Sequence, residues 1–462
     1  INSLDGLNNL QSISGDIELI KNDNLEDFSG IEELTRIEGN LVISDHINMT
    51  SFQGLETVLG IGGDLVIENN NSLINARGFE NLNKIDGDFY CGQNKQLTTF
   101  NGLNNLLTIN GKFTVVQNNI LDGLTGLNDL ISIGSDFTVE ENAALKSLIG
   151  ISSLENIYGD FEILNNSQLS TLIGINNIST ISQNLKVQAN NALINFDGLG
   201  SLENIIGKLE ILDNPNLKSL EGLENLALVG GNFNLDTNNN LETLNGLQGL
   251  EKIGGLFNVI FNNKLENLSG LDNLLILEGG LQLFNCSLVT LKGLNKLEFL
   301  GNLIVSPAEN LENFSGLEQL NTIANDLIIK GNKSLSSADG LTNIKTIGGD
   351  LVFEFTDINS LAGFDNLERI QGSLLFINNK NLENIASMAS LQVLGNDLMI
   401  ESTKLKHLNG LRSVKKIDGQ VTIIENDSLA ICNIISVCNF LDDGHEATIN
   451  NKTVHKKLII SE

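Results

Sequence analysis

Paired carboxylates recur in this chain at a spacing that could bind a metal ion. Asp64 and Glu68 lie four residues apart, and the same pair returns as Asp350 and Glu354. Residues at even separations on a strand share one face, and calcium takes several oxygen ligands of this kind. These residues are therefore calcium candidates. The alternative is that each aspartate is a solvated turn residue that discourages pairing at a sheet edge.

The sequence lacks the usual arrangements of catalytic residues. Its four histidines show neither a metal-ligand spacing nor a neighbouring cysteine pair. No nucleophile elbow, phosphate loop or dinucleotide fingerprint is present, and the frequent glycines have another explanation below. We therefore expect a non-enzymatic protein with no cofactor other than the calcium already considered.

A repeat of 23 or 24 residues positions nearly all of these side chains. A glycine followed by an apolar residue marks each copy from Gly6 to Gly410, with Ser387 replacing it once. A second glycine usually follows, at a turn that needs positive φ or close backbone approach. Next comes a strand such as Leu65-Val66-Ile67, whose middle residue points outward. The repeat predicts an all-β fold, a parallel β-solenoid of about 18 coils over residues 1–428.

An asparagine recurs three residues after most of the predicted strands. Stacked at one coil spacing, these amides can bond to the backbone of their own turn and of the neighbouring turn. We expect irregular corners at His46, Ala308, Thr356 and Thr403, which interrupt the series. The regular members of this predicted asparagine ladder are Asn70, Asn94, Asn118, Asn142, Asn166, Asn190, Asn214, Asn238 and Asn262.

The consensus Leu-x-Gly-Leu-x-x-Leu-x-x-Ile-x-Gly-x-Leu-x-Ile-x-x-Asn covers almost the whole chain, as in the coil from Leu244 to Asn262. This pattern, with strand starts such as Gly39-Asn40-Leu41-Val42-Ile43, resembles the receptor L domain. That family comprises the leucine-rich-repeat-like right-handed β-helices of insulin and epidermal growth factor receptors. The greater length and regularity here are more similar to expanded cell-surface versions, as in Bacteroidetes. The resemblance implies a right-handed solenoid that recognises a ligand without catalysis, and growth-factor binding does not follow from it.

The pattern changes after residue 428, and we assign residues 429–462 to a C-terminal cap. Ser428 could begin a helix over 429–441 with one apolar face, and Ala447–Asn450 could form a final strand. Cys432 and Cys438 could bridge only if that helix breaks between them, so both redox states stay open. Cys91 and Cys286 lie eight coils apart, roughly 38 Å at ~4.8 Å per coil, and are expected to be buried free thiols.

The outward strand residues of the C-terminal half form a predicted apolar strip. Such strips usually mark partner surfaces. Alternatively, neighbouring β-branched residues simply stack well, or residues 454–460 cover them. The candidate contact residues are Ile304, Ile328, Val352, Leu375 and Met399 in the middle positions, with Phe284 and Ile377 alongside.

Composition narrows the classes of partner. The formal net charge of -30 argues against nucleic acid and anionic membranes, and no stretch approaches the ~20 apolar residues of a membrane span. We expect an extracellular or cell-surface recognition or adhesion module that binds a protein or a glycan along its strands. Self-association through the apolar strip is a further possibility. A structural spacer is the alternative, and an ice-binding solenoid is disfavoured because only Thr114 and Thr138 stack as a threonine array.

Overall fold

The computed structural model describes residues 1–429, 447–449 and 452–454. The chain divides into two compact units, one formed by residues 1–231 and 237–241 and the other by residues 232–236 and 242–462. Each unit is a parallel β-solenoid, so the predicted fold class is confirmed. Among the described residues, no helix is long and apolar enough to cross a membrane.

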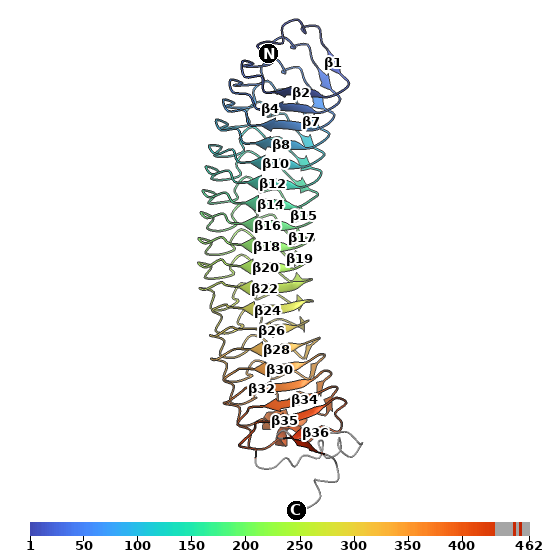
Figure 1. Cartoon of the computed structure of the whole chain (residues 1–462), viewed down its shortest axis with the longest axis vertical. Coiled ribbons are helices and arrows are strands. Elements are labelled where there is room, and N and C mark those ends of the chain that lie inside the picture. The colour runs from blue at the N-terminus through green and yellow to red at the C-terminus, as the bar shows by residue number, and fades with distance from the viewer. Residues whose placement is uncertain (430–446, 450–451, 455–462) are drawn as a thin grey trace, which may run out of the picture. The chain divides into compact units, whose positions relative to one another are not determined.

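Every regular coil of the first unit contributes one long and one short strand, and the long strands lie on one face (Figure 1). The long strands are β2 (Ile17–Ile20), β4 (Leu41–Ser44), β6 (Leu65–Glu68), β8 (Phe89–Gly92), β10 (Phe113–Val116), β12 (Phe137–Glu140), β14 (Phe161–Leu164), β16 (Leu185–Gln188) and β18 (Leu209–Leu212). The short strands are β1 (Ser12–Ile13), β3 (Arg36–Ile37), β5 (Gly60–Ile61), β7 (Lys84–Ile85), β9 (Thr108–Ile109), β11 (Ser132–Ile133), β13 (Asn156–Ile157), β15 (Thr180–Ile181), β17 (Asn204–Ile205) and β19 (Leu228–Val229).

The second unit follows the same plan. Its long strands are β20 (Phe233–Asp236), β22 (Leu256–Ile260), β24 (Gly280–Phe284), β26 (Leu303–Val305), β28 (Leu327–Lys330), β30 (Leu351–Glu354), β32 (Leu374–Ile377), β34 (Leu398–Glu401) and β35 (Val421–Ile424). Its short strands are β21 (Lys252–Ile253), β23 (Ile276–Leu277), β25 (Phe299–Leu300), β27 (Thr322–Ile323), β29 (Thr346–Ile347), β31 (Arg369–Ile370) and β33 (Val393–Leu394).

The end of the described chain departs from this plan. Strand β36 (Ala447–Ile449) continues the long sheet parallel to β35, and β37 (Lys452–Val454) pairs antiparallel with β36. The expected helix over 429–441, with Cys432 and Cys438, lies outside the described residues apart from Leu429. Residues 455–460, which could have covered the apolar strip, lie outside them as well.

Strand pairing in register places equivalent residues of successive coils over one another. Phe113 pairs with Phe89 on one side and with Phe137 on the other. The rings of Phe113 and Phe137 stack with their centroids 4.9 Å apart, and both side chains are fully buried. Burying one such side chain contributes about 1.5–3 kcal/mol. Because each coil buries its apolar residues against its neighbours, the core is continuous within each unit.

The two glycines of the repeat serve different purposes. The marker glycines have positive φ, for example 118° at Gly198, a conformation that L-residues with a side chain rarely adopt. The second glycine does not have positive φ. At Gly87, an added Cβ would lie 2.1 Å from Oδ1 of Asp64 in the preceding coil. Of the two reasons considered from the sequence, close approach therefore explains the second glycine.

The asparagine ladder lies inside the corner that follows each long strand. Asn118 is fully buried, and its Nδ2 donates to the carbonyls of Cys91 and Val116 at 2.9 and 3.1 Å. Its Oδ1 accepts the backbone N–H of Asn94 at 3.0 Å. The residue before each ladder position usually adopts φ near +55°, as Gln117 does at 56°. The fully buried members are Asn70, Asn94, Asn118, Asn142, Asn166, Asn190, Asn214 and Asn238 in the first unit and Asn262 in the second.

The expected irregularity at most interrupted corners is wrong. The residues before His46, Thr356 and Thr403 keep the positive φ of the regular coils, at 61°, 54° and 53°. The imidazole of His46 replaces the amide, because Nδ1 accepts the N–H of Asn22 while Nε2 donates to the carbonyl of Leu19. The Oγ1 atoms of Thr356 and Thr403 donate to the asparagine of the next coil. At Ala308 the expectation holds, since Pro307 precedes it without positive φ and β26 is short.

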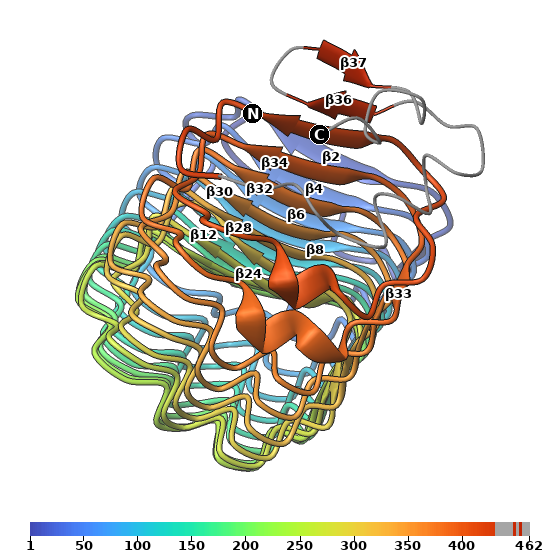
Figure 2. The same cartoon turned by 90° about the horizontal axis from the view of Figure 1, so that it is seen from below.

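Two coils of the second unit form a 3-10 turn at the position of the marker glycine. Ser387 lies in η1 (Ala386–Ser390) and Gly410 in η2 (Asn409–Leu411), and Gly410 lacks the positive φ of the other marker glycines. The two helical turns lie side by side, away from the long strands of their unit (Figure 2). An added Cβ at Gly410 would lie 1.8 Å from the carbonyl oxygen of Ile385, so close packing explains this glycine.

Cys91 and Cys286 are buried and free, as predicted. Burial raises the pKa of the Cys91 thiol and, to a smaller extent, that of Cys286, so the reactive thiolate is scarce at neutral pH. We predict that iodoacetamide labels Cys91 at least ~100-fold more slowly in the folded protein than in urea, because its coil must open first. Peptide mass spectrometry measures each site separately. Equal labelling rates with and without urea would contradict the buried position.

Candidate functional site

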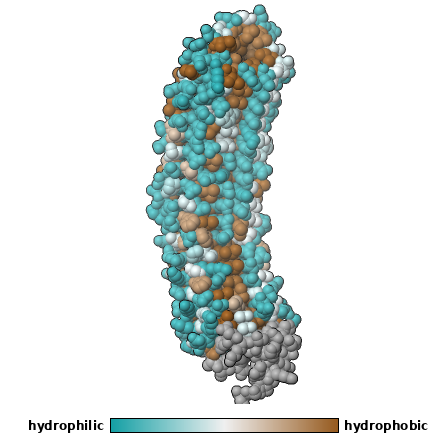
Figure 3. Space-filling view, in the orientation of Figure 1, coloured by the Kyte–Doolittle hydropathy of each residue, from teal (hydrophilic) through white to brown (hydrophobic). Residues whose placement is uncertain are grey.

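Five consecutive middle residues on the long strands of the second unit are apolar and stack in register. Ile304 pairs with Ile328, Ile328 with Val352, Val352 with Leu375, and Leu375 with Met399. We call Ile304, Ile328, Val352, Leu375 and Met399 the apolar column. Polar residues end it on both sides, with Gln282 before Ile304 and Thr422 after Met399. A brown stripe on the strand face of this unit shows the hydrophobic side chains (Figure 3).

The members of the apolar column are not equally accessible. Ile304, Ile328, Leu375 and Met399 are half-buried, whereas Val352 is only 6% exposed. Val352 therefore offers less surface than expected, since this short side chain lies between the longer Ile328 and Leu375. The two residues predicted alongside lie two residues beyond the middle position of their strands, where Phe284 is 36% exposed and Ile377 is half-buried.

Carboxylates border the apolar column on both sides. The residues directly before the five strands are Asn302, Asp326, Asp350, Ser373 and Asp397. The residues two positions after the column members are Ser306, Lys330, Glu354, Ile377 and Glu401. Nζ of Lys330 lies 2.9 Å from Oε2 of Glu354, so the cation in this border is already paired. The result is an apolar stripe with a mainly negative margin.

The aspartates at the strand starts form a second ladder, which the sequence reading missed. Oδ1 of Asp64 accepts the backbone N–H of Asp88 at 2.7 Å, and Oδ1 of Asp350 accepts that of Ser373 at 2.6 Å. Asparagine replaces aspartate in some coils with the same bond, as at Asn184. A signal was present in the sequence, since Gly87 follows Asp64 by 23 residues and leaves room for its carboxylate.

The calcium candidates are engaged with protein groups in this arrangement. Glu354 pairs with Lys330, and Oε1 of Glu68 accepts a long hydrogen bond of 3.5 Å from the hydroxyl of Tyr90. Burial, followed by the charge of Glu68, raises the pKa of Tyr90. Within the described part of the chain, no group of three or more potential ligands converges on a metal position. The geometry thus gives each candidate carboxylate a role in the protein itself.

On the first unit, the strand face has a different chemistry. The middle residues of successive strands pass from Val66 and Tyr90 through Thr114 and Thr138 to charged residues. Burial raises the pKa of Glu162; Lys186 opposes this shift, whereas nearby carboxylates reinforce it. Burial alone would also raise the pKa of Asp136, but the N–H of Asp160 and the ammonium of Lys112, 3.0 Å away, together lower it. From Thr114 onward the middle positions of this face are therefore polar, in contrast to the apolar column.

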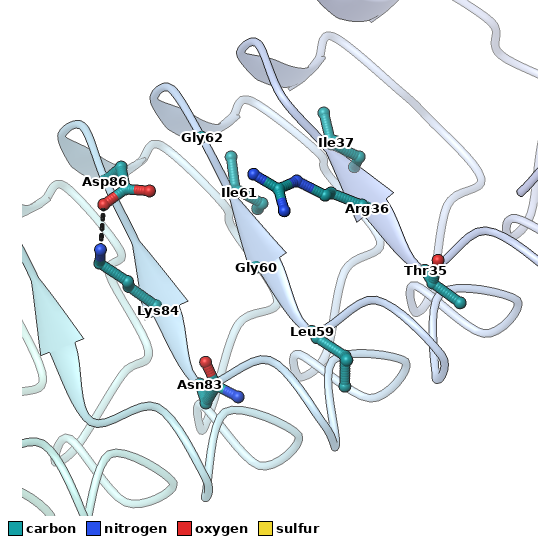
Figure 4. Close-up of a pocket in the computed structure, with 10 residues that line it drawn as sticks. All are labelled: Thr35, Arg36, Ile37, Leu59, Gly60, Ile61, Gly62, Asn83, Lys84 and Asp86. Carbon is teal, nitrogen blue, oxygen red and sulfur yellow. Dashed lines mark ion pairs between the residues drawn. The ribbon is translucent and has the colours of Figure 1, made fainter. Parts of the chain in front are cut away.

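A hollow of about 390 Å³ lies on the short-strand side of the first unit. It forms where Gly60 stands between the long side chains of Arg36 and Lys84, as Figure 4 shows. Nε of Arg36 lies 3.2 Å from Glu38, and Lys84 is paired with Asp86. The Oγ1 of Thr35, also in the lining, donates to the carbonyl of Gln11. Because both cations already face carboxylates, the hollow offers little net charge to a ligand.

Comparisons with known proteins add little to this picture. No family model matches the chain, and no curated protein is similar to it. Among solved structures, a crystal structure of a TLR13–ssRNA13 complex is similar at 15% identity, covering 88% of this chain and 90% of that chain, with a TM-score of 0.19.

Proposed function

We propose that this protein is a non-enzymatic recognition module that binds a protein partner on the long-strand face of its second unit. The apolar column carries this proposal. Middle strand positions elsewhere in the repeat are often polar or charged, and Gln282 and Thr422 end the column abruptly. Side-chain stacking alone would not require five apolar residues in succession. A desolvated apolar contact is the usual centre of a protein interface.

The proposal extends to an extracellular or cell-surface location and to adhesion as the biological use. This extension rests on the resemblance of the repeat to receptor L domains, particularly their expanded cell-surface forms. A glycan fits the column less well than a protein, because sugars need hydrogen-bonding side chains where the column offers methyl and methylene groups. Glycans therefore enter the test as competing ligands.

The test is a screen of extracellular protein and glycan arrays with the wild-type chain, with and without calcium. Each hit is then measured against the triple variant Ile328→Ser, Leu375→Ser and Met399→Ser, which leaves the buried Val352 intact. We expect at least a ~10-fold rise in Kd, since truncation of several central apolar contacts typically costs more than about 1.4 kcal/mol in total.

A matched control variant replaces three exposed apolar residues of the first unit by serine. Leu107, Ile131 and Ile149 are 41%, 40% and 54% exposed, and their replacement by serine should leave Kd within about twofold. Circular dichroism checks that both variants remain folded. An unchanged Kd in the column variant, or a set of hits made up of glycans alone, would refute the proposal.

A further inference from the structure

We infer that the partner of the apolar column is an amphipathic helix whose apolar stripe is bordered by Lys or Arg. This inference rests on the proposed function and specifies the chemistry of the ligand. Apolar side chains form the centre of the surface, and Asp326, Asp350 and Asp397 lie on one side. On the other side lie Glu401 and Glu354, the latter paired with Lys330. A complementary partner therefore carries cations on both sides of an apolar stripe.

The dimensions of the column suit a short helix. Five strands spaced at ~4.8 Å span about 19 Å from the first to the last, which is the length of about 13 helical residues. The column is one residue wide, as is the seam formed by the a and d positions of a heptad. Positions e and g flank that seam, so lysines there would face the three aspartates on one side and Glu401 on the other.

A second copy of this chain is a poorer occupant. Each copy would bring its own Asp326, Asp350, Asp397, Glu354 and Glu401 to the interface, and the chain has a formal net charge of -30. Like charges placed together oppose association. We therefore expect no self-association through the apolar column in sedimentation velocity, and self-association lost in the Ile328→Ser, Leu375→Ser and Met399→Ser variant would count against this inference.

The strand-start ladder provides a way to remove the charges without changing the fold. Asn302 accepts the backbone N–H of Asp326 through Oδ1 at 3.2 Å, and Asn40 accepts that of Asp64 at 2.7 Å. Asparagine is thus already a native residue of this ladder. The triple variant Asp326→Asn, Asp350→Asn and Asp397→Asn keeps each Oδ1 acceptor and removes three negative charges. Asp64→Asn, Asp88→Asn and Asp160→Asn make the same change in the first unit, where Oδ1 also accepts a backbone N–H.

The probes are three synthetic helical peptides of about three heptads, a length that favours helix formation. The first carries Leu at a and d with Lys at e and g, the second replaces Lys with Glu, and the third replaces Leu with Ser. Fluorescence anisotropy measures each Kd against the full chain at low and at moderate salt. We expect only the Leu/Lys peptide to bind well, with an affinity that falls as salt rises.

The variants separate this inference from the proposed function. We expect Kd for the Leu/Lys peptide to rise about fivefold to tenfold in the Asp326, Asp350 and Asp397 variant and less than about twofold in the first-unit control. Three results would overturn the inference: equal binding of the Leu/Glu peptide, equal binding of the Ser/Lys peptide, or an equal loss in both aspartate variants. If charge removal has no effect while Ile328→Ser, Leu375→Ser and Met399→Ser weaken binding, the proposed function stands and the inference fails. If the serine variant has no effect, both fail.

Discussion

Gly198→Ala is expected to destabilise the first unit by about 3 kcal/mol or more, while Gly200→Ala, two residues away, is tolerated. Gly198 has φ of 118°, and a Cβ there would lie 2.2 Å from the carbonyl oxygen of Leu172 in the preceding coil. Alanine must therefore accept a strained backbone and push two coils apart. At Gly200, nothing lies within 4 Å of an added Cβ and φ is not positive. Alanine there reduces the freedom of the unfolded chain and should change stability by less than about 1 kcal/mol.

Urea unfolding followed by circular dichroism gives the midpoint for each variant. Hydrogen exchange then shows where protection is lost, because coils of a repeat array can open without global unfolding. For Gly198→Ala, the loss should centre on the coils that contain Leu172 and Gly198. Equal midpoints for the two variants would show that neither the positive φ nor the contact with Leu172 matters.

The sequence was sufficient to predict the repeat, the inward and outward strand positions and the asparagine corner. Each of these depends on residues within one coil or on a spacing of 23 or 24. The buried free thiols of Cys91 and Cys286 followed from the same pattern. These features were predictable because in-register stacking converts a sequence period directly into neighbours in space.

What the sequence reading missed involves contacts between different positions of adjacent coils. The carboxylate of Asp64 looked like a calcium ligand or a solvated turn residue, yet it accepts the N–H of Asp88 and lies against Gly87. The corner at His46 looked irregular, although its two ring nitrogens reproduce the acceptor and donor of an amide. In both cases the role of the side chain depends on its hydrogen-bond geometry and cannot be read from the residue type.

The sequence pattern also could not predict how exposed each residue of the apolar column is. Alternation indicates which way Val352 points, but not whether Ile328 and Leu375 leave it accessible. Side-chain length in the coils above and below determines that. The candidate surface is therefore narrower than predicted, and its carboxylate border becomes as informative as its apolar centre.

The asparagine ladder gives the second large effect, and Asn118→Leu tests it. Leucine has a similar size but no polar group, so the carbonyl of Cys91 and the N–H of Asn94 lose their side-chain partner, whereas the carbonyl of Val116 keeps the N–H of Gln93 at 3.0 Å. Each buried group left unsatisfied costs about 1–3 kcal/mol, so the two groups predict a loss of about 2–6 kcal/mol. The adjacent Asn119 is exposed, and Asn119→Leu should change stability by less than about 0.5 kcal/mol. Urea midpoints measure the difference.

Asn118→Asp separates hydrogen bonding from packing at the same position. An aspartate oxygen can still accept the N–H of Asn94, but an ionised carboxylate cannot donate to the carbonyls of Cys91 and Val116. It would also bury a charge without a counter-ion. At neutral pH this variant should therefore be less stable than Asn118→Leu, and the gap should narrow in acid as the carboxyl is protonated and regains a donor. If the Asn118→Leu and Asn118→Asp variants were both as stable as the wild type, the buried amides would contribute nothing to stability, and apolar stacking alone would hold the coils together.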